Sequence, residues 1–356
     1  MTALAARPLG YRIHVLDPDP ACAAAPVVER VIAASFDDAL AAAELASGVD
    51  VVTLEIEKVA AEALNAAQAH APVRPSPTVL RTVQDRLRQK RWLVEHGFPV
   101  GPFREAFDED SFAAAARTFG GRVFAKSSVG GYDGRSQARL DGLNTIQGGW
   151  KAVGEAPCVV EEALELSAEL SVMVARGPLG ETAVYPAARN YHERQILAWS
   201  SLPGDFAPAL ERGARNLAQS IAVALDVVGL LCVEMFQTTD GRLLVNELAP
   251  RPHNSYHASA SACVTGQFEQ LVRAVCGLPL GATDIVRPAA IVNLLGDLWT
   301  DGKTPAFERA LALPGVTLSL YGKGEPRAGR KMGHLVALGT TPHEARARVL
   351  EGYARL

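Results

Sequence analysis

The sequence lacks an excess of positive charge, since its 35 lysines and arginines are outnumbered by 39 aspartates and glutamates. Proteins that bind nucleic acid usually carry a basic patch, so this balance argues against that class of function. No run of 18 or more apolar residues occurs, which argues against a membrane-spanning helix. Met1 to Arg12 contain no basic segment followed by an apolar one, so we predict no secretory signal. Together these absences predict a cytoplasmic protein.

Several common arrangements of catalytic or metal-binding residues are also missing. The five cysteines are scattered and form no C-x-x-C pair, which predicts buried free thiols in a reducing compartment. His253 and His257 lie four residues apart, as in a zinc site, but no Glu or Cys accompanies them at suitable spacing. We find no H-E-x-x-H sequence, no Ser-His-Asp arrangement and no G-x-x-x-x-G-K-[ST] loop. Function must therefore come from other groups of residues.

The first 75 residues alternate between strand and helix patterns. Tyr11–Leu16 and the mostly apolar Val49–Ile56 predict strands. Between them, Ser35 is the expected N-cap of an alanine-rich helix that ends at Gly48. This alternation predicts an α/β domain with a parallel sheet. Such a domain normally opens with a central strand and a glycine-rich turn, whereas this chain begins within what resembles the first helix. We therefore expect an upstream segment to exist.

The rest of the chain divides into a long middle part and a small β-rich end. After the proline-rich connector Pro72–Pro77, Ser76 and Pro77 predict a helix that runs to about His96. Further helices are predicted at Asp110–Phe119, Pro208–Leu225 and Gln267–Cys276, and strands at Arg122–Lys126, Cys158–Glu162, Glu169–Arg176, Thr182–Pro186, Ala289–Gly296 and Gly315–Tyr321. With a linker at Pro279–Pro288, the predicted domains are 1–76, 77–278 and 279–356.

Two acidic residues are predicted to face each other across a hairpin. Asp240-Gly241 is a strong signal for a two-residue turn. In that register Glu234 lies directly opposite Glu247, among apolar neighbours. Opposed carboxylates repel unless a cation lies between them, and Mg²⁺ prefers carboxylate and phosphate oxygens. The pair predicts a magnesium site; a solvated pair at a sheet edge, or a neutralising Lys or Arg, remains the alternative.

Phosphate-binding and anion-binding residues surround this pair in the sequence. Lys126 ends a predicted strand and precedes a glycine-rich loop that could fold over phosphates, which includes Tyr132 and Arg135. Five residues from Arg251 to Ser255 offer a guanidinium, an imidazole, an amide and a hydroxyl group. A third basic group contains Lys323 and Arg330. Phosphate, metal and a second anionic ligand together predict an ATP-driven ligation.

The same residues resemble the ATP-grasp superfamily, and within it the N5-carboxyaminoimidazole ribonucleotide synthetase family of purine biosynthesis. The segments that carry the resemblance run in order along the chain: Val52–Glu57, Asp85–Lys90, Gly130–Arg135, Asn246–Ser255, Ser261–Glu269 and Gly329–His334. The resemblance implies an ATP-grasp fold with an N-terminal Rossmann-like domain, here without its first strand, and a small C-terminal β-rich domain. It also implies a homodimer.

The implied reaction uses ATP and bicarbonate to carboxylate 5-aminoimidazole ribonucleotide, with release of ADP and phosphate. Carried over, the residues that contact ATP are Arg86, Lys126, Gly131, Tyr132, Asp133, Gly134, Arg135, Ser136, Gln137, Glu161, Glu162, Ala163, Leu164, Glu169, His192, Asn246 and Glu247. The ribonucleotide would meet Glu55, Tyr132, Arg135, Lys323 and Arg330. Glu234 and Glu247 would hold Mg²⁺, and Lys126, Arg251, His253 and Asn254 would be catalytic.

Three departures from the family leave alternatives open. The opening strand and its glycine-rich turn are missing, Tyr256 replaces a usual glycine beside the expected bicarbonate site, and Ser136 replaces a common glycine of the loop. A different ATP-grasp ligase, such as a formate-dependent glycinamide ribonucleotide enzyme or a biotin carboxylase, is one alternative. A nucleotide-binding protein without catalytic activity is the other, because Tyr256 and the shortened start could disable the site.

Overall fold

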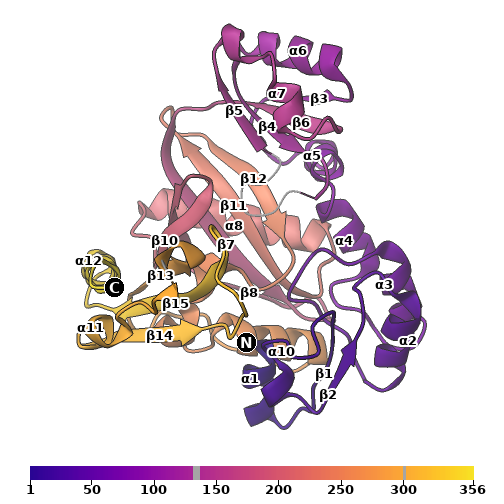
Figure 1. The fold of residues 1–356 in the computed structure, drawn as a ribbon, viewed down its shortest axis with the longest axis vertical. Coiled ribbons are helices and arrows are strands. Elements are labelled where there is room, and N and C mark those ends of the chain that lie inside the picture. Colours follow the sequence, from indigo (N-terminus) through magenta and orange to yellow (C-terminus); the bar gives the residue numbers. More distant parts are fainter. Residues whose placement is uncertain (131–136, 300–301) are drawn as a thin grey trace.

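The computed structural model describes residues 1–130, 137–299 and 302–356, and their strands form three sheets (Figure 1). A two-stranded sheet lies in the N-terminal part, a four-stranded sheet forms a separate lobe, and a nine-stranded sheet runs through the middle of the molecule. Over the described ranges, no helix is long and apolar enough to cross a membrane. Predicted residues Gly131, Tyr132, Asp133, Gly134, Arg135 and Ser136 lie outside the described residues.

The N-terminal part is built from short elements around a small parallel sheet. In chain order they are α1 (Thr2–Ala6), η1 (Arg7–Leu9), β1 (His14–Asp17), η2 (Ala25–Val27), β2 (Arg30–Ala33), α2 (Ala39–Ser47) and α3 (Ala61–Gln68). The predicted strand at Val49–Ile56 is wrong, because only Val52 pairs, as an isolated parallel bridge to Val73. A strand requires a continuous hydrogen-bonded partner, and here Val52 alone exchanges bonds, with Pro72 and Arg74.

Helix boundaries differ from the prediction where a better cap is available. Asp38, not Ser35, caps α2, since its carboxylate accepts from the N–H groups of Leu40 and Ala41. Gly48 ends that helix as predicted. The helix expected from Pro77 to His96 is two helices, α4 (Pro77–Val83) and α5 (Arg86–Glu95). Asp85 breaks it, because its side chain caps α5 by accepting from Arg88 N.

The four-stranded lobe is antiparallel and is covered on its outer face by α6 (Figure 1). Its elements are β3 (Phe103–Ala106), α6 (Glu109–Thr118), β4 (Arg122–Ser127), β5 (Gln137–Asp141), η3 (Leu143–Thr145), α7 (Gly149–Ala152) and β6 (Cys158–Glu162). The strand order is β3-β6-β4-β5. Phe112, Val123 and Val160 form part of its fully buried core. The lobe thus holds the ends of β4 and β6 above the large sheet.

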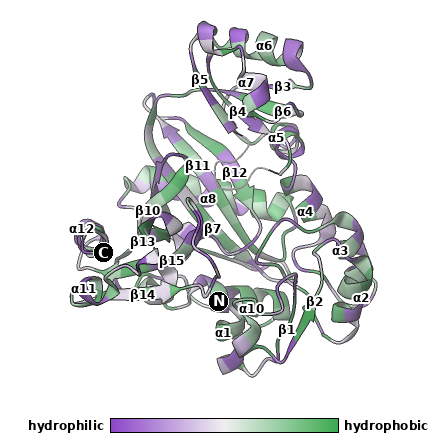
Figure 2. Ribbon diagram, in the orientation of Figure 1, coloured by the Kyte–Doolittle hydropathy of each residue, from purple (hydrophilic) through white to green (hydrophobic). Residues whose placement is uncertain are grey.

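The nine-stranded sheet is buried on both faces along its strand β11. Its elements and their helices are β7 (Leu166–Arg176), β8 (Thr182–Val184), β9 (Ala188–Glu193), β10 (Ile196–Leu202), α8 (Pro208–Ala224), β11 (Gly229–Thr238), β12 (Leu243–Ala249), η4 (Asn254–Tyr256), α9 (Ser259–Ala262) and α10 (Gln267–Cys276). Alternate residues of β11 join different cores: Leu231 packs with Ile221 of α8, and Leu230 with Leu271 of α10. Figure 2 accordingly shows hydrophobic residues along β11 and β12.

The C-terminal strands continue the same sheet rather than form a separate one. They are β13 (Ala289–Leu295), β14 (Val316–Leu320) and β15 (Lys331–Leu338), with η5 (Gly296–Leu298), α11 (Phe307–Leu311) and α12 (Pro342–Ala354) beside them. β13 pairs with β10, and the sheet order is β12-β11-β7-β9-β10-β13-β15-β14. The predicted strands at Ala289 and Gly315 are confirmed, whereas β9, β10 and β15 were not predicted. Four of the five cysteines are buried and all five are free, Cys276 being half-buried.

Candidate active site

Glu234 of β11 and Glu247 of β12 are directly paired, as predicted. The turn between them is different, because Thr238 N bonds to Arg242 O and three residues form the loop, with Gly241 at a positive φ of 88°. Near the turn the register is therefore one residue off the prediction. A β-bulge at Asn246 adds one residue to β12 and restores the pairing of the two glutamates.

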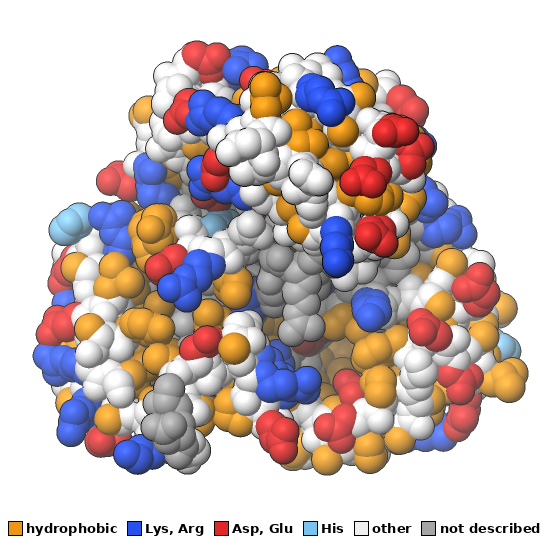
Figure 3. Space-filling model, turned by 45° about the horizontal axis from the view of Figure 1, so that its top comes forward, with side chains coloured by type: hydrophobic (Ala, Val, Ile, Leu, Met, Phe, Trp, Pro, Cys, Tyr) orange, Lys and Arg blue, Asp and Glu red, His pale blue; other side chains and the backbone are white. Residues whose placement is uncertain are grey.

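The bulge residue Asn246 joins the hairpin to the four-stranded lobe. Its amide nitrogen donates to Glu234 Oε2 at 3.3 Å, and its Oδ1 accepts from Lys126 Nζ at 3.2 Å. Lys126 lies near the end of β4, in the other sheet. A lysine of the lobe and a carboxylate of the large sheet thus share one amide. Figure 3 shows that the molecule is hollowed between this lobe, at the top, and the parts below it.

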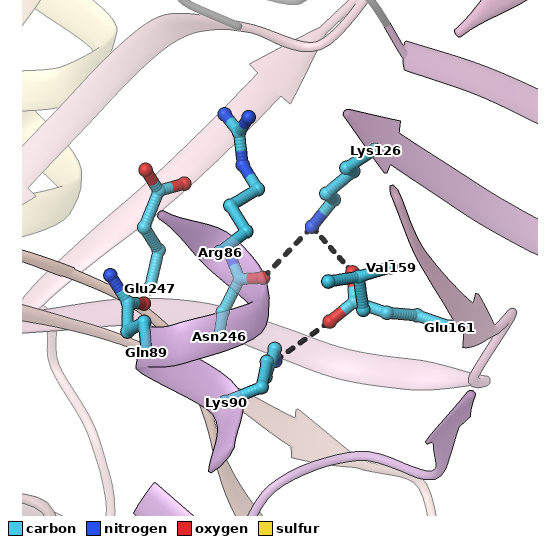
Figure 4. A pocket seen from close by; sticks show the side chains of 8 residues that line it. All are labelled: Arg86, Gln89, Lys90, Lys126, Val159, Glu161, Asn246 and Glu247. Atoms are coloured by element: carbon cyan, nitrogen blue, oxygen red, sulfur yellow. Dashed lines mark hydrogen bonds and ion pairs between the residues drawn. The ribbon is translucent and has the colours of Figure 1, made fainter. Parts of the chain in front are cut away.

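Glu161 holds two ammonium groups in a pocket lined by residues of both sheets and of α5 (Figure 4). Lys126 Nζ lies 2.7 Å from Glu161 Oε2, and Lys90 Nζ lies 2.7 Å from Glu161 Oε1. All three side chains are at least 85% buried. Burial opposes ionisation of Glu161, but the two lysines outweigh it and lower its pKa to about 2. The carboxylate is therefore ionised and fixes both lysines.

One face of α5 lines the same pocket. Arg86, Gln89 and Lys90 follow the i, i+3, i+4 spacing that places side chains on one side of a helix (Figure 4). Arg86 Nη1 donates to Ser127 O at 2.9 Å, and Gln89 Oε1 accepts from Leu248 N at 3.1 Å. Arg86 was predicted from the resemblance. Gln89 and Lys90 were missed, although the helical spacing from Arg86 could have found them.

His253 is held against Glu234 by a buried polar network. Its Nε2 lies 3.0 Å from Glu234 Oε1, and its Nδ1 lies 2.8 Å from Ser255 Oγ. Burial opposes ionisation of Glu234, yet His253, His192 and Lys126 lower its pKa to about 2. Ser255 is tied in turn to Ser171 Oγ at 2.8 Å. Asn190 and Ser200 complete the network, and none of these three partners was predicted.

Tyr256 points away from the pocket. Its ring is fully buried and packs edge-on against Tyr185, and its hydroxyl lies 2.9 Å from Ser171 O and 2.8 Å from Pro186 O. The replacement of glycine by tyrosine is thus accommodated in the core of the sheet. The ring is therefore not among the residues that line the pocket of Lys126, and the expectation that Tyr256 could disable the site stays a prediction.

Arg251 reaches an acidic partner from the N-terminal part of the chain. Its Nε lies 3.0 Å from Glu57 Oε1, and both side chains are largely buried. Burial raises the pKa of Glu57, and so does the nearby Glu247, whereas Arg251 opposes the shift. Glu57 was not predicted. Glu55, which was, is nearly half exposed and accepts from Thr2 N at 2.8 Å.

The remaining predicted residues occupy five places. Glu162, Ala163 and Leu164 leave the end of β6, where Glu162 N bonds to Pro102 O and Ala163 N to Arg122 O, both at 3.0 Å. Glu169 and His192 form an ion pair on β7 and β9; burial opposes protonation of His192, but Glu169 and Glu234 raise its pKa. The others are Gln137, paired with Lys126; Asn254, the first residue of η4; and Lys323 and Arg330, near β15.

Lys323 and Arg330 lie outside the pocket that contains Lys126. Lys323 Nζ donates to Lys331 O at 3.0 Å, and Arg330 Nη1 donates to Glu325 O at 2.9 Å. Lys323 lines a second cavity together with Trp299, Leu320 and Met332. The structure therefore gathers Arg86, Lys126 and Glu247 in one pocket and leaves Lys323 at another.

The paired glutamates fit a magnesium ion that is shared with a ligand. Within the described ranges, no three His, Cys, Asp or Glu residues gather into a metal-binding group. Mg²⁺ requires only one or two protein carboxylates when phosphate oxygens supply the rest of its coordination. Glu234 is ionised and is directly paired with Glu247. The site thus suits Mg²⁺ bound together with phosphates and does not suit a metal held by protein alone.

Comparison with known proteins gives three family matches that together span most of the chain. The ribonucleotide synthetase preATP-grasp domain matches residues 1–84, the ATP-grasp domain residues 91–268, and the phosphoribosylaminoimidazole carboxylase C-terminal domain residues 289–348. A curated relative, the N5-carboxyaminoimidazole ribonucleotide synthase of Brucella melitensis, is 42% identical over 95% of this chain and 92% of its own length. The predicted fold class is confirmed.

Solved structures agree with these matches. The ADP complex of an N5-carboxyaminoimidazole ribonucleotide synthetase is 37% identical and superimposes with a TM-score of 0.92, over 99% of this chain and 92% of the other. An Aspergillus clavatus N5-carboxyaminoimidazole synthase in complex with ADP and 5-aminoimidazole ribonucleotide is 28% identical, with a TM-score of 0.90 over 100% and 96% of the two chains. The likeness thus extends across all three parts of the molecule.

Proposed function

The chain belongs to the N5-carboxyaminoimidazole ribonucleotide synthase family of ATP-grasp ligases, and on that premise we propose that it carboxylates 5-aminoimidazole ribonucleotide with ATP and bicarbonate. The observation that carries the proposal is the junction of Lys126, Asn246 and Glu234, which unites the two sheets. In this reading the protein is a cytoplasmic enzyme of purine biosynthesis. We retain the division into domains at 1–76, 77–278 and 279–356.

Lys126 and Arg86 are the cations that would meet the nucleotide phosphates. Both line one pocket, and both are fixed before any ligand arrives, Lys126 by Glu161 and Arg86 by Ser127 O. A preorganised cation stabilises developing charge without having to reorient during the reaction. Gly131 to Gln137, Glu162 to Leu164, Glu169 and His192 are assigned to the nucleotide by the family resemblance.

Glu234 and Glu247 would hold Mg²⁺. When bound, the ion neutralises charge on the phosphate oxygens during transfer. This chain contributes the two opposed carboxylates, and Asn246 and His253 hold Glu234 in place. Because Asn246 also contacts Lys126, the carboxylate and the phosphate-binding cation are fixed relative to each other.

Arg251, His253 and Asn254 would bind and orient bicarbonate. A bicarbonate oxygen attacks the γ-phosphorus, the bond to the bridging oxygen breaks, and ADP leaves with that electron pair. The carboxyphosphate formed is short-lived, so it must arise beside the amine and away from water. The amine nitrogen then bonds to the carboxyl carbon, either directly or after CO₂ is released, with loss of phosphate and a proton. Glu55, Lys323 and Arg330, with Tyr132 and Arg135, are assigned to the ribonucleotide.

ADP release by the purified chain tests this function. With ATP, Mg²⁺ and bicarbonate present, release should require 5-aminoimidazole ribonucleotide. Release that instead requires glycinamide ribonucleotide and formate would indicate a different ATP-grasp ligase. Binding of ATP without release under any of these conditions would indicate a non-catalytic protein. The homodimer is tested separately, since light scattering should give twice the mass of one chain.

A further inference from the structure

Two histidines, the buried His334 and the half-buried His257, stack on each other between the hairpin site and the C-terminal strands. The rings of His257, which follows η4, and His334, on β15, have centroids 4.9 Å apart and lie within 24° of parallel. Phe268 of α10 also stacks on His257, with the ring centroids 5.5 Å apart. His334 is only 2% exposed. The function proposed above uses neither histidine.

Hydrogen bonds fix the protonation state of His257. Gln267 Oε1 accepts from His253 N at 2.9 Å, so its other terminal atom is the amide nitrogen. That nitrogen donates to His253 O at 3.0 Å and lies 2.9 Å from His257 Nδ1. An amide nitrogen has no lone pair to offer, so His257 Nδ1 must accept and carry no proton. His257 is therefore uncharged, with its proton on Nε2.

His334 supports the basic residue of the C-terminal part. The hydroxyl of Tyr321 lies 2.8 Å from His334 Nδ1, and it donates when that nitrogen is unprotonated. Lys323 Nζ lies 5.2 Å from the centroid of the Tyr321 ring, in a cation–π contact. His334 therefore supports Tyr321, and Tyr321 in turn contacts Lys323, whose Nζ is also held by Lys331 O.

The stack is linked to both sites through intermediate side chains. At one end, Gln267 and His253 connect His257 to Glu234. At the other, Tyr321 connects His334 to Lys323. We infer that His257 and His334 are positioning residues whose uncharged stack fixes Lys323, and so the ribonucleotide, relative to the metal-binding hairpin. This inference rests on the proposed function, because it takes Lys323 as a ribonucleotide residue.

The surroundings of the stack favour its uncharged form. The titratable and charged groups that face it are His253, Tyr321, Lys331 and the amino terminus, with Lys323 beyond Tyr321. Burial is the main cause that lowers the pKa of His257 well below its usual value, and His334, His253 and Lys331 lower it further. Burial also lowers the pKa of His334 to about 4. The hydrogen bonds of the two histidines and the lowered pKa values thus both indicate that His257 and His334 are uncharged.

Steady-state kinetics of the purified chain test the inference. His334→Phe keeps a ring in the stack but loses the acceptor for Tyr321, so the KM for 5-aminoimidazole ribonucleotide should rise about tenfold, as expected for one lost hydrogen bond. The KM for ATP should stay unchanged. Tyr321→Phe removes the same bond from the other side and should have the same effect, and the double variant should be no worse than either single one. His334→Asn, which offers an oxygen near the place of Nδ1, should recover most of the loss.

Control variants and the contrary outcomes separate this inference from its premise. His96 also stacks on an aromatic ring, Trp92 at 4.2 Å, but lies exposed at the end of α5, so His96→Phe should leave both KM values unchanged. An active wild-type enzyme whose ribonucleotide KM is unaltered in both His334→Phe and Tyr321→Phe would overturn the positioning role alone. Equal rises in the KM for ATP would also overturn it, by showing a general structural effect. Wild-type protein that ignores the ribonucleotide would remove the proposed function and this inference together.

Discussion

Among single residues, Glu161 shows how charges are arranged before a ligand binds. A carboxylate buried alone would be protonated, but this one is flanked by Lys90 and Lys126 and stays ionised. The three groups together carry one net positive charge. In the proposed function, ATP phosphates would therefore meet a lysine whose position is already fixed, and the net positive charge of the three groups would attract them.

Lys90→Met should destabilise the protein, because it leaves Glu161 buried with one cation in place of two. Removal of one partner from a buried ion pair typically costs about 3 kcal/mol of unfolding free energy. Urea denaturation at pH 7 measures this loss of unfolding free energy. The matched control is Arg122→Met, which breaks the exposed ion pair with Glu165 and should cost less than about 1 kcal/mol. Equal losses in the two variants would contradict the importance of burial.

Glu247→Gln should abolish ADP formation while the fold is kept. The amide retains the shape of the side chain but loses the charge that would hold Mg²⁺ against Glu234, so we expect turnover to fall by about a hundredfold or more. ADP release and thermal unfolding are the two measurements. Glu165→Gln, at a side chain 73% exposed, is the control and should leave both unchanged. Normal turnover in the Glu247 variant would remove the metal assignment.

Among whole elements, the β11–β12 hairpin shows which features can be predicted from sequence. The glutamate pair was predicted correctly, although the turn length was wrong, because a bulge at Asn246 compensates for the longer loop. A one-residue error in register normally moves every side chain to the other face. No local pattern of residues predicts the bulge at Asn246, so only the structure shows that it compensates for the longer loop.

The errors elsewhere have a similar origin in contacts between distant segments. Val49–Ile56 has the composition of a strand but lacks a continuous partner, and strand pairing depends on residues far away in the chain. Lys90 could have been found from its helical spacing to Arg86. Glu57 and Gln267 could not, since their partners Arg251 and His253 come from other parts of the chain. The resemblance to a family supplied most of the site for the same reason.

The break between α4 and α5 sets the position of Arg86, and its cap can be tested. Asp85→Ala should lower the unfolding free energy by about 1 kcal/mol, the usual cost of a lost N-cap. It should also raise the KM for ATP, because Arg86 is the first residue of α5. Asp38→Ala removes the equivalent cap of α2 and should cost the same stability with no change in that KM. An unchanged KM in the Asp85 variant would argue against this role of the break.

At the scale of the whole molecule, one sheet joins the proposed catalytic hairpin to the C-terminal strands. β12 and β11 lie at one end of its order, β15 and β14 at the other. The region between them contains the buried His334 and the half-buried His257, whose pKa values are both lowered, so that the folded protein keeps both uncharged. Protonation of these groups favours the unfolded chain, so acid should lower the free energy of unfolding of the protein.

Stability should therefore fall on mild acidification, before the buried carboxylates begin to matter. His334 has a folded-state pKa of about 4 against 6.5 when unfolded, so the unfolded chain binds more protons between these values and stability is lost as pH falls through that window. For His334 alone the loss from pH 7 to pH 5 is about 2 kcal/mol. Glu161 and Glu234, with pKa values lowered to about 2 from 4.5, lose their contributions only below about pH 4.5. Urea denaturation at pH 7 and pH 5 measures the first window. His334→Phe should reduce the difference between the two pH values by about 2 kcal/mol, the share of His334, while the share of His257 remains. A variant that stays as acid-sensitive as the wild type would show that other groups cause the loss.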